Sequence, residues 1–366
     1  MLGWGFRSIL FAAVCIVIVI LSTVFLLVGV KPPSSPNNGS TTFWASEFTV
    51  CASNTDICCA VDHCLRSARV AVVEPVFTTT AYSSFYSFYS KYAHTPMGVL
   101  IKKDLGLLNT TLREGWGFSS SLYSFVTSSL AKRAGLSVGN NTWIISDVDV
   151  NNGELFNSRG GRNFDVVILG FTEYVTLKEY LAYKHFVASG GHILVLSACN
   201  FLAEVSYNPL TKRVSLVEGH GWVFNGTAAW RGVYARWYTD NTDWVGSNYA
   251  LYSARGYTIS GAVANTTHPL SVFLRTRFST LLFNDYAPHE ENIITNSSDL
   301  VIAYWRLSYS KHPDWVVAIY EHRYQRGSLI HLGVFGTDIL SQDKALQYFV
   351  LASIYYFTNY PHSYTI

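Results

Sequence analysis

The strongest constraint on the fold is one strand–helix–strand pattern in the middle of the chain. Residues 163–170 (NFDVVILG) form a short apolar run, typical of a strand buried on both faces. Thr176 and Glu179 are spaced as in a capping box, which predicts the start of a helix. Gly190 and Gly191 are typical of a helix end, and a second apolar run, 192–197, follows. The pattern predicts a βαβ unit, and therefore a parallel sheet with helices on its faces.

The same alternation extends over residues 66–366. We expect further strands at 69–77, 142–146 and 327–333, an antiparallel pair at 300–308 and 315–323, and helices at 121–134 and 343–358. The last helix has its apolar side chains at helical spacing, which directs Leu346, Phe349, Val350 and Ile354 inward. We therefore predict one doubly wound α/β domain with a mostly parallel sheet and an antiparallel C-terminal hairpin.

An uncharged apolar segment near the N-terminus, 9–30, is long enough to cross a hydrocarbon core of about 30 Å. We expect it to be an uncleaved signal anchor, preceded by a short cytoplasmic tail at 1–8. Residues 31–65 begin with a Pro/Ser/Asn-rich run and are predicted to form a stalk. The resulting prediction is a single-pass membrane protein whose C-terminal domain, 66–366, lies outside the cytoplasm.

Cysteines and glycosylation sequons favour the same location. Four cysteines fall close together in the stalk, and two short disulfides or a metal site are the two interpretations of this cluster: Cys51, Cys58, Cys59 and Cys64. Six Asn-x-Ser/Thr sequons are candidate glycosylation sites: Asn38, Asn109, Asn140, Asn225, Asn265 and Asn296. These features predict a disulfide-bonded glycoprotein.

The composition excludes some classes of function. Hydrophobic residues make up 49% of the chain and charged residues 14%, which excludes intrinsic disorder, and a net charge of +2 gives no electrostatic basis for nucleic-acid binding. The chain is rich in aromatic residues, notably at 81–90 and 230–244. Such loops can bind carbohydrate or a protein partner by stacking.

Several polar residues are candidates for chemistry because they follow predicted strands or lie in glycine-rich loops. Asp147 and Asp149 follow the strand 142–146 and could share a cation, or could be solvated loop acids. Cys199 follows the strand 192–197 and is either a nucleophile or a buried structural residue. His220 lies in a glycine-rich loop that could present it to a ligand.

Two segments carry a family resemblance: 170–180 (GFTEYVTLKEY) and 186–200 (FVASGGHILVLSACN). They resemble the class I glutamine amidotransferase-like fold, and in particular the C-terminal domain of the N,N-dimethylformamidase large subunit. This resemblance implies a doubly wound, flavodoxin-like sheet. Residues 78–82 and 326–333 are similar in character to the same group. In that family, amide hydrolysis depends on an iron held by tyrosines and a glutamate. The resemblance places Glu173 and Tyr174 at the family's Glu-Tyr position, with Tyr174 as a candidate iron ligand.

The resemblance also sets a limit on thiol chemistry. Amidotransferases use a cysteine at a Gly-x-Cys-x-Gly elbow, whereas Cys199 lies in Leu-Ser-Ala-Cys-Asn-Phe. Two functions remain open. The first is a membrane-anchored, non-catalytic binding or scaffold module, which needs no cofactor. The alternative is a cell-surface hydrolase of amide C–N bonds that uses Glu173 and Tyr174, or Cys199 with a histidine such as His220, with iron as a possible cofactor.

Overall fold

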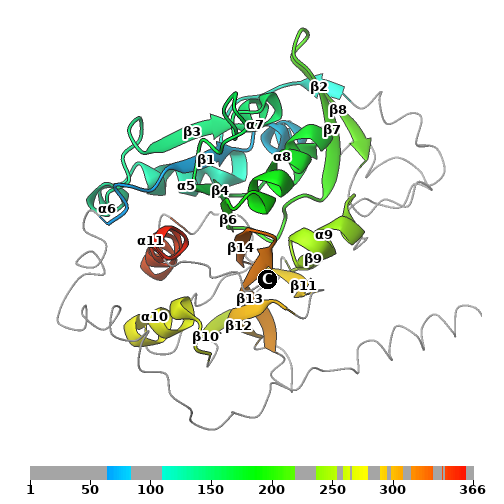
Figure 1. The fold of residues 1–366 in the computed structure, drawn as a ribbon. Coiled ribbons are helices and arrows are strands. Elements are labelled where there is room, and N and C mark those ends of the chain that lie inside the picture. The colour runs from blue at the N-terminus through cyan, green and yellow to red at the C-terminus, as the bar shows by residue number, and fades with distance from the viewer. Residues whose placement is uncertain are drawn as a thin grey trace, which may run out of the picture. The chain divides into compact units, whose positions relative to one another are not determined.

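The central element of the structure is an eight-stranded sheet (Figure 1). The computed structural model describes residues 64–83, 109–218, 236–253, 259–263, 266–278, 289–294, 298–307, 315–332, 340 and 343–359, all within the unit Phe43–Ile366. In spatial order the strands are β10 (Ile259–Val263), β12 (Leu300–Leu307), β13 (Trp315–Tyr324), β14 (Gly327–Leu332), β6 (His192–Val195), β4 (Val166–Leu169), β1 (Val70–Glu74) and β3 (Thr142–Ser146).

The strand directions confirm a mixed α/β fold with a mostly parallel sheet. Strands β14, β6, β4, β1 and β3 run parallel to one another. Strands β13, β12 and β10 extend the sheet in antiparallel pairings, and β12 with β13 is the predicted hairpin. Two neighbours in the parallel part are distant in sequence, because β14, near the C-terminus, pairs with β6.

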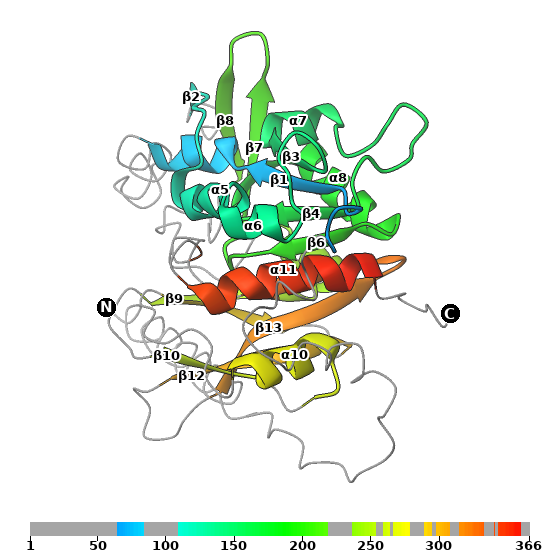
Figure 2. The same cartoon turned by 90° about the vertical axis from the view of Figure 1, so that its left-hand side faces the viewer.

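Helices cover both faces of the sheet, as the predicted doubly wound arrangement requires. Side chains of β1 alternate between two cores: Val70 and Val72 face one, and Ala71 and Val73 face the other. The first core includes α5 (Ser120–Val126), α6 (Ser129–Arg133), α10 (Pro269–Phe278) and α11 (Lys344–Asn359), the layer that faces the viewer in Figure 2. The second includes α7 (Asp147–Asn152), α8 (Leu177–Ala188) and α9 (Tyr238–Trp244). This two-sided burial accounts for the apolar strands.

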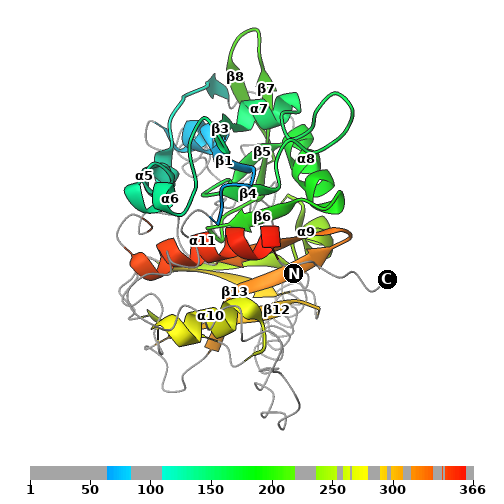
Figure 3. The same ribbon diagram turned by 60° about the vertical axis from the view of Figure 1, so that its left-hand side comes forward.

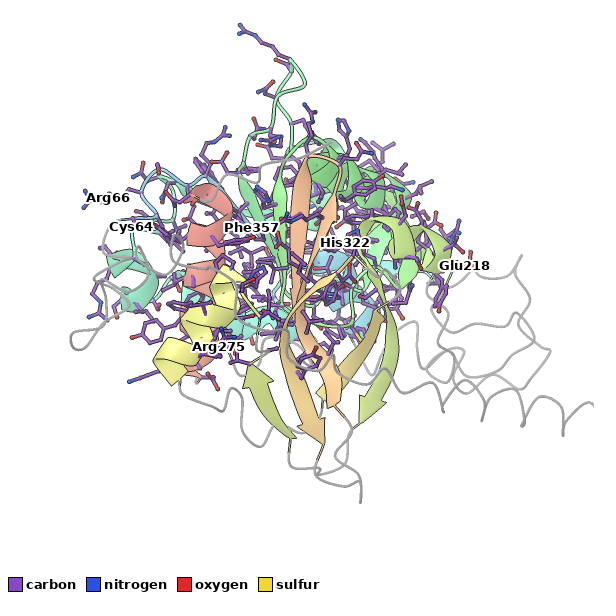
Figure 4. The ribbon with its side chains drawn as sticks, turned by 60° about the horizontal axis from the view of Figure 1, so that its bottom comes forward. Cys64, Arg66, Glu218, Arg275, His322 and Phe357 are labelled. Carbon is purple, nitrogen blue, oxygen red and sulfur yellow. The ribbon has the colours of Figure 1, made fainter. Side chains whose placement is uncertain are left out.

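The C-terminal helix α11 packs as its sequence predicts. Leu346, Phe349, Val350 and Ile354 are all buried in the first core. Farther along the helix is Phe357, which Figure 4 labels. Its ring stacks on the imidazole of His192 at a centroid distance of 4.7 Å. Helix α11 therefore closes the face formed by β6 and β4.

Two smaller sheets accompany the central one. A four-stranded sheet has the order β2 (Asn109–Thr111), β8 (Arg213–Glu218), β7 (Ala203–Asn208) and β5 (Tyr174–Thr176), and its β7–β8 hairpin projects beyond the central sheet (Figure 3). A second pair joins β9 (Ser247–Ser253) to β11 (His289–Ile294). Because β5 follows β4 and β7 follows β6, the four-stranded sheet grows from the carboxyl ends of the parallel strands.

Two predicted elements have different bounds in the structure. The strand predicted at 69–77 ends at Glu74, and residues 76–83 are helical, because Pro75 has no amide hydrogen to donate to a strand and suits the start of a helix. The helix predicted at 121–134 is two helices, preceded by a short 3₁₀ turn, η2 (Gly117–Ser119). The break falls at Ser128, whose side chain accepts the Ala131 amide and caps α6.

The localisation prediction is corrected by the structure. No helix among the described residues is long and apolar enough to cross a membrane. This finding gives no support to a single-pass membrane protein with an extracytoplasmic body. The segment on which that prediction rested, 9–30, lies outside the described residues, as do the tail 1–8 and most of the stalk 31–65.

The predicted disulfides and most of the sequons also fall outside the described part of the chain. Cys51, Cys58 and Cys59 lie there, Cys64 is half-buried, and no disulfide joins two described residues. The sequons at Asn38, Asn225, Asn265 and Asn296 lie outside as well. Of the other two, Asn140 is exposed in a turn, and the Asn109 side chain accepts a hydrogen bond from Arg213 at 2.9 Å. The disulfides and glycosylation stay predictions.

Candidate functional site

The candidate site lies where the carboxyl ends of β1, β4 and β6 meet, the usual ligand-binding edge of an open α/β sheet. Three segments leave the strands here: the helix 76–83 after β1, the loop 170–173 after β4, and the loop 196–202 after β6. The two loops carry the candidates Glu173 and Cys199, and the candidate Tyr174 begins β5 directly after Glu173. The topology therefore brings together residues from three separate parts of the chain.

The loop after β4 is fixed by side chains that hydrogen-bond to its backbone. The three bonds are Phe171 N–H to Ser119 Oγ (2.8 Å), Thr172 N–H to Asn200 Oδ1 (3.0 Å) and Tyr174 N–H to Thr78 Oγ1 (3.0 Å). Asn200 in turn donates from Nδ2 to the Ser197 carbonyl at 2.6 Å. Since all three acceptors lie on other segments, the position of the Glu-Tyr pair is set by tertiary contacts.

Two tyrosine rings and one carboxylate contact one another at the end of this loop. The Tyr82 hydroxyl, on the helix 76–83, donates to Glu173 Oε2 at 2.5 Å. The Tyr82 ring also packs edge-on against the Tyr174 ring at a centroid distance of 5.8 Å. Glu173 and Tyr174 are both buried. The sequence placed Tyr82 in a segment similar to the family but gave it no role, because its partner lies 91 residues away.

Aromatic rings form an apolar wall beside this cluster. The Phe118 and Phe171 rings lie 5.3 and 5.7 Å from the Tyr82 ring, and 5.2 Å from one another. Cys199 is 7% exposed and packs in the same cluster with Phe171 and Leu202. This apolar packing favours the structural interpretation of Cys199. His220, the candidate base, lies outside the described residues.

The two candidate metal carboxylates after β3 have different partners. Asp149 Oδ2 accepts hydrogen bonds from both the backbone and the hydroxyl of Ser146, each at 2.7 Å, which completes a capping box on α7. Asp147 is fully buried, and its Oδ2 accepts the Phe77 amide at 2.9 Å. The two carboxylates therefore have separate hydrogen-bond partners, and a shared cation stays a prediction.

A second carboxyl group, Glu179, lies next to Asp147. Burial raises the pKa of Asp147 to about 8, and burial together with Asp147 raises the pKa of Glu179 well above its usual range. The Tyr183 hydroxyl donates to Glu179 Oε1 at 3.0 Å. The sequence identified Glu179 only as the capping-box residue of α8, a role that the structure confirms. The sequence did not predict that Glu179 lies beside Asp147, because the two residues are distant in the chain.

Part of the aromatic-rich segment 230–244 is structural. The Trp237 ring stacks on Tyr180 at 4.1 Å, and the Trp244 indole N–H donates to the Tyr180 hydroxyl at 2.8 Å. Both tryptophans are buried in the second core. Residues 84–90 and 230–235, which the stacking hypothesis also used, lie outside the described residues.

The donor atoms of the tyrosine–glutamate cluster fit the iron that the family resemblance implies. Among the described residues no group of three or more His, Cys, Asp or Glu side chains is arranged to hold a metal ion. Tyr82, Glu173 and Tyr174 offer two phenol oxygens and a carboxylate, which are hard ligands. The Tyr82 and Glu173 oxygens lie 2.5 Å apart, and the Tyr174 ring packs against the Tyr82 ring.

The fold and the site together define an α/β protein with a partly buried tyrosine–glutamate cluster at the carboxyl edge of its parallel strands. Residues 43–264 match the sequence model of a family described as "N,N-dimethylformamidase beta subunit-like, C-terminal". The chain belongs to this family. The matched range contains all three residues of the cluster.

Solved structures with a similar arrangement share little sequence with the chain. A β-galactosidase from Bacillus circulans sp. alkalophilus is 12% identical with a TM-score of 0.40, over 78% of this chain and 30% of that one. A putative ThuA-like protein from Bacteroides uniformis is 14% identical with a TM-score of 0.39, over 64% of this chain and 81% of that one. A cytoplasmic protein from Salmonella typhimurium is 10% identical with a TM-score of 0.40, over 67% of this chain and 87% of that one.

The matched β-galactosidases are much longer than this chain. The chain spans less than a third of the length of the β-galactosidases that it matches. The family model that matches names no amidotransferase, so the wider resemblance to glutamine amidotransferases gains no support from it. No curated protein matches the chain.

Proposed function

We propose that this protein hydrolyses the C–N bond of a small, non-peptide amide at the cluster of Tyr82, Glu173 and Tyr174. The observation that carries the proposal is the 2.5 Å hydrogen bond from the Tyr82 hydroxyl to the Glu173 carboxylate at the carboxyl edge of the sheet. Membership of the dimethylformamidase-like family supports the same chemistry. The finer features of the proposal, the substrate class and the iron, rest on this combination.

In the reaction, the oxygen of a water molecule bonds to the amide carbonyl carbon, the C–N bond breaks, and the amine leaves with a proton from that water. Tyr82, Glu173 and Tyr174 would hold the iron, which when bound supplies a Lewis acid that polarises the carbonyl group. The loop hydrogen bonds keep Glu173 and Tyr174 in place before substrate arrives, so little ordering is needed during the reaction. The Phe118 and Phe171 rings exclude bulk water and favour a substrate with an apolar part.

A non-catalytic binding module is the second candidate, and the packing of Cys199 is the observation that favours it. A thiol enclosed by Phe171 and Leu202 is in an apolar setting that does not favour nucleophilic chemistry. Under this candidate the buried tyrosines and Glu173 serve stability alone. The two candidates differ in whether the cluster binds metal.

Metal analysis and amine release distinguish the candidates. We expect the purified chain to carry stoichiometric iron and to release amine from a small alkylamide, and we expect both properties to fall at least tenfold in Tyr174→Phe and Glu173→Gln. Tyr207→Phe is a matched control, because its ring packs against Phe77 in the neighbouring apolar cluster. Cys199→Ser should retain activity.

A wild-type chain that binds no stoichiometric iron and releases no amine would refute the hydrolase. The binding module would then be the better account of the fold.

A further inference from the structure

A buried histidine, His331, lies beside the loop that follows β6. It is near the carboxyl end of β14, in register with Val195 at the end of β6. Because β14 and β6 are parallel, His331 lies at the same edge of the sheet as the candidate site. The residue is 3% exposed, and it lies beyond the range 43–264 that matches the family. The proposed hydrolase gives this buried polar group no role.

Hydrogen bonds at both ring nitrogens fix one form of the imidazole. Nε2 of His331 lies 2.8 Å from the Ser197 carbonyl oxygen, which can only accept, so Nε2 carries a hydrogen. Burial lowers the pKa of His331 to about 4, so at neutral pH the ring carries no second hydrogen. Nδ1 must therefore accept a hydrogen bond, and the Tyr320 hydroxyl lies 2.8 Å from it.

The Tyr320 hydroxyl is itself held by the segment that begins β9. It lies 2.5 Å from the Ser247 hydroxyl and 3.1 Å from the Val245 carbonyl oxygen. The Ser247 hydroxyl is 3.4 Å from Nδ1 of His331, so the shorter distance assigns Tyr320 as the donor to the ring. Strands β9, β13 and β14 together therefore orient this imidazole.

The carbonyl group that His331 holds is also held by Asn200. Asn200 Nδ2 donates to the Ser197 carbonyl oxygen at 2.6 Å, and Asn200 Oδ1 accepts the Thr172 amide at 3.0 Å. A carbonyl oxygen has two lone pairs, so it can accept from His331 and Asn200 at once. The Ser197 carbonyl group thus connects β14 to the loop after β4.

The loop after β6 also contacts the backbone of Glu173 directly. The Glu173 carbonyl oxygen accepts the Leu202 amide at 3.0 Å and the Ala203 amide at 3.1 Å. A displacement of this loop is therefore transmitted to the residue whose carboxylate accepts the Tyr82 hydrogen bond.

We propose that His331 is a positioning residue of the candidate site. Its Nε2–H group holds the Ser197 carbonyl group and so orders the loop after β6, which sets the position of Glu173. An apolar side chain in place of the imidazole leaves a buried carbonyl oxygen without this donor, which destabilises the loop. The effect on amide hydrolysis rests on the proposed function, whereas the ordering of the loop does not.

Hydrogen exchange of the full chain tests the ordering. In His331→Leu we expect peptides that cover 170–174 and 196–202 to lose about tenfold in protection relative to the wild type. Peptides of α8, 177–188, should change less than about twofold, because the opening is local. A loss of general stability would lower the protection of α8 as well.

Two further variants test the hydrogen bond itself. His331→Gln keeps a side-chain N–H donor, so both loops should stay within about threefold of the wild-type protection. Tyr320→Phe removes the donor to Nδ1 and should lower the protection of both loops by about threefold, which serves if His331→Leu does not fold.

His192→Leu is the matched control. His192 is the buried histidine at the other end of the same strand pair, where Nδ1 lies 3.1 Å from Ser328 Oγ. This variant removes a buried imidazole far from the loop after β6, so the protection of the two loops relative to α8 should stay as in the wild type. Loop protection that is unchanged in His331→Leu, or that falls as much in His331→Gln or His192→Leu, would overturn the proposal.

Amine release tests the consequence for catalysis. We expect kcat to fall about tenfold in His331→Leu with KM within about threefold of the wild type, and kcat to recover in His331→Gln. A kcat that falls no more than in His192→Leu would overturn the role in catalysis. Because hydrogen exchange needs neither iron nor substrate, a wild type without amine release refutes the hydrolase and leaves the exchange result standing. A failed exchange result leaves the hydrolase assay to be judged separately.

Discussion

Replacement of Gly170 by alanine tests how tightly the site loop is built. Gly170 follows β4, and a Cβ atom at this position would lie 2.3 Å from Ser119 Oγ and 2.8 Å from Ser119 Cβ. A rotation of the serine side chain can move Oγ but not Cβ, so the clash also displaces backbone. The same Oγ accepts the buried Phe171 amide at 2.8 Å, and that hydrogen bond is lost when Ser119 moves.

The expected destabilisation has two parts. A buried amide left without its acceptor costs about 1–3 kcal/mol, and overpacking of a closed site costs about 1–3 kcal/mol. Gly170→Ala should therefore lower the free energy of unfolding by about 2–6 kcal/mol and the midpoint of thermal unfolding by about 3–10 °C. Ser119→Ala removes only the hydrogen bond, so it should lose about 1–3 kcal/mol.

The double variant Ser119→Gly/Gly170→Ala separates these parts. It removes both serine atoms that meet the new Cβ, so it should be more stable than Gly170→Ala alone by about 1–3 kcal/mol, less the small entropic effect of the new glycine. Thermal and urea unfolding of the wild type, Gly170→Ala, Ser119→Gly and the double variant measure the coupling. A Gly170→Ala protein as stable as the wild type, or a double variant no more stable than Gly170→Ala, would refute the steric account.

Two further predictions concern parts of the fold away from the site. Phe349→Ala, in the fully buried face of α11, should cost about 3–5 kcal/mol in urea unfolding, whereas Lys344→Ala, exposed on the same helix, should stay within about 0.5 kcal/mol; equal effects would contradict the assigned face. Burial tends to raise the pKa of Asp165, but its hydrogen bonds with Arg69 lower that pKa overall. The pair therefore stabilises the fold at a pH above the usual aspartate pKa, and this stabilisation is lost as the pH falls through the pKa of Asp165 in the folded protein. Because both side chains are partly exposed, Arg69→Met should cost no more than about 1 kcal/mol at neutral pH and should move the acid loss of stability to higher pH; an unchanged acid limb would count against the pair.

Local signals in the sequence were sufficient for the parallel sheet and its helices. The strand predicted at 142–146 is β3 without change, and the Thr176 capping box begins α8. Both depend on near neighbours in the chain, where β-branched runs and cap spacing are decisive. The prediction of a helix through Ser128 was wrong, because a serine there prefers to cap a new helix rather than continue the old one.

The contacts that make the site depend on distant segments, which a single sequence does not reveal. Glu173 and Tyr174 were identified by resemblance, but the hydrogen bond from Tyr82 joins residues 91 positions apart. Asp147 was noted because it follows a strand, and the pattern of two acids two residues apart left open a shared cation or two solvated loop acids. The structure separates the two: Asp149 caps α7, and Asp147 faces the Phe77 amide.

The position of β14 has a consequence for the synthesis of the chain. Strand β6 is complete at Val195, yet its neighbour on one side, β14, begins only at Gly327, so a nascent chain carries an open strand edge for more than a hundred residues. Such an edge is a template for pairing between chains, and late closure of long-range contacts slows folding. A fragment that ends at residue 264, where the family match ends, would lack β12, β13, β14 and α11. We expect that fragment to aggregate, so that production of a working site requires the chain through α11.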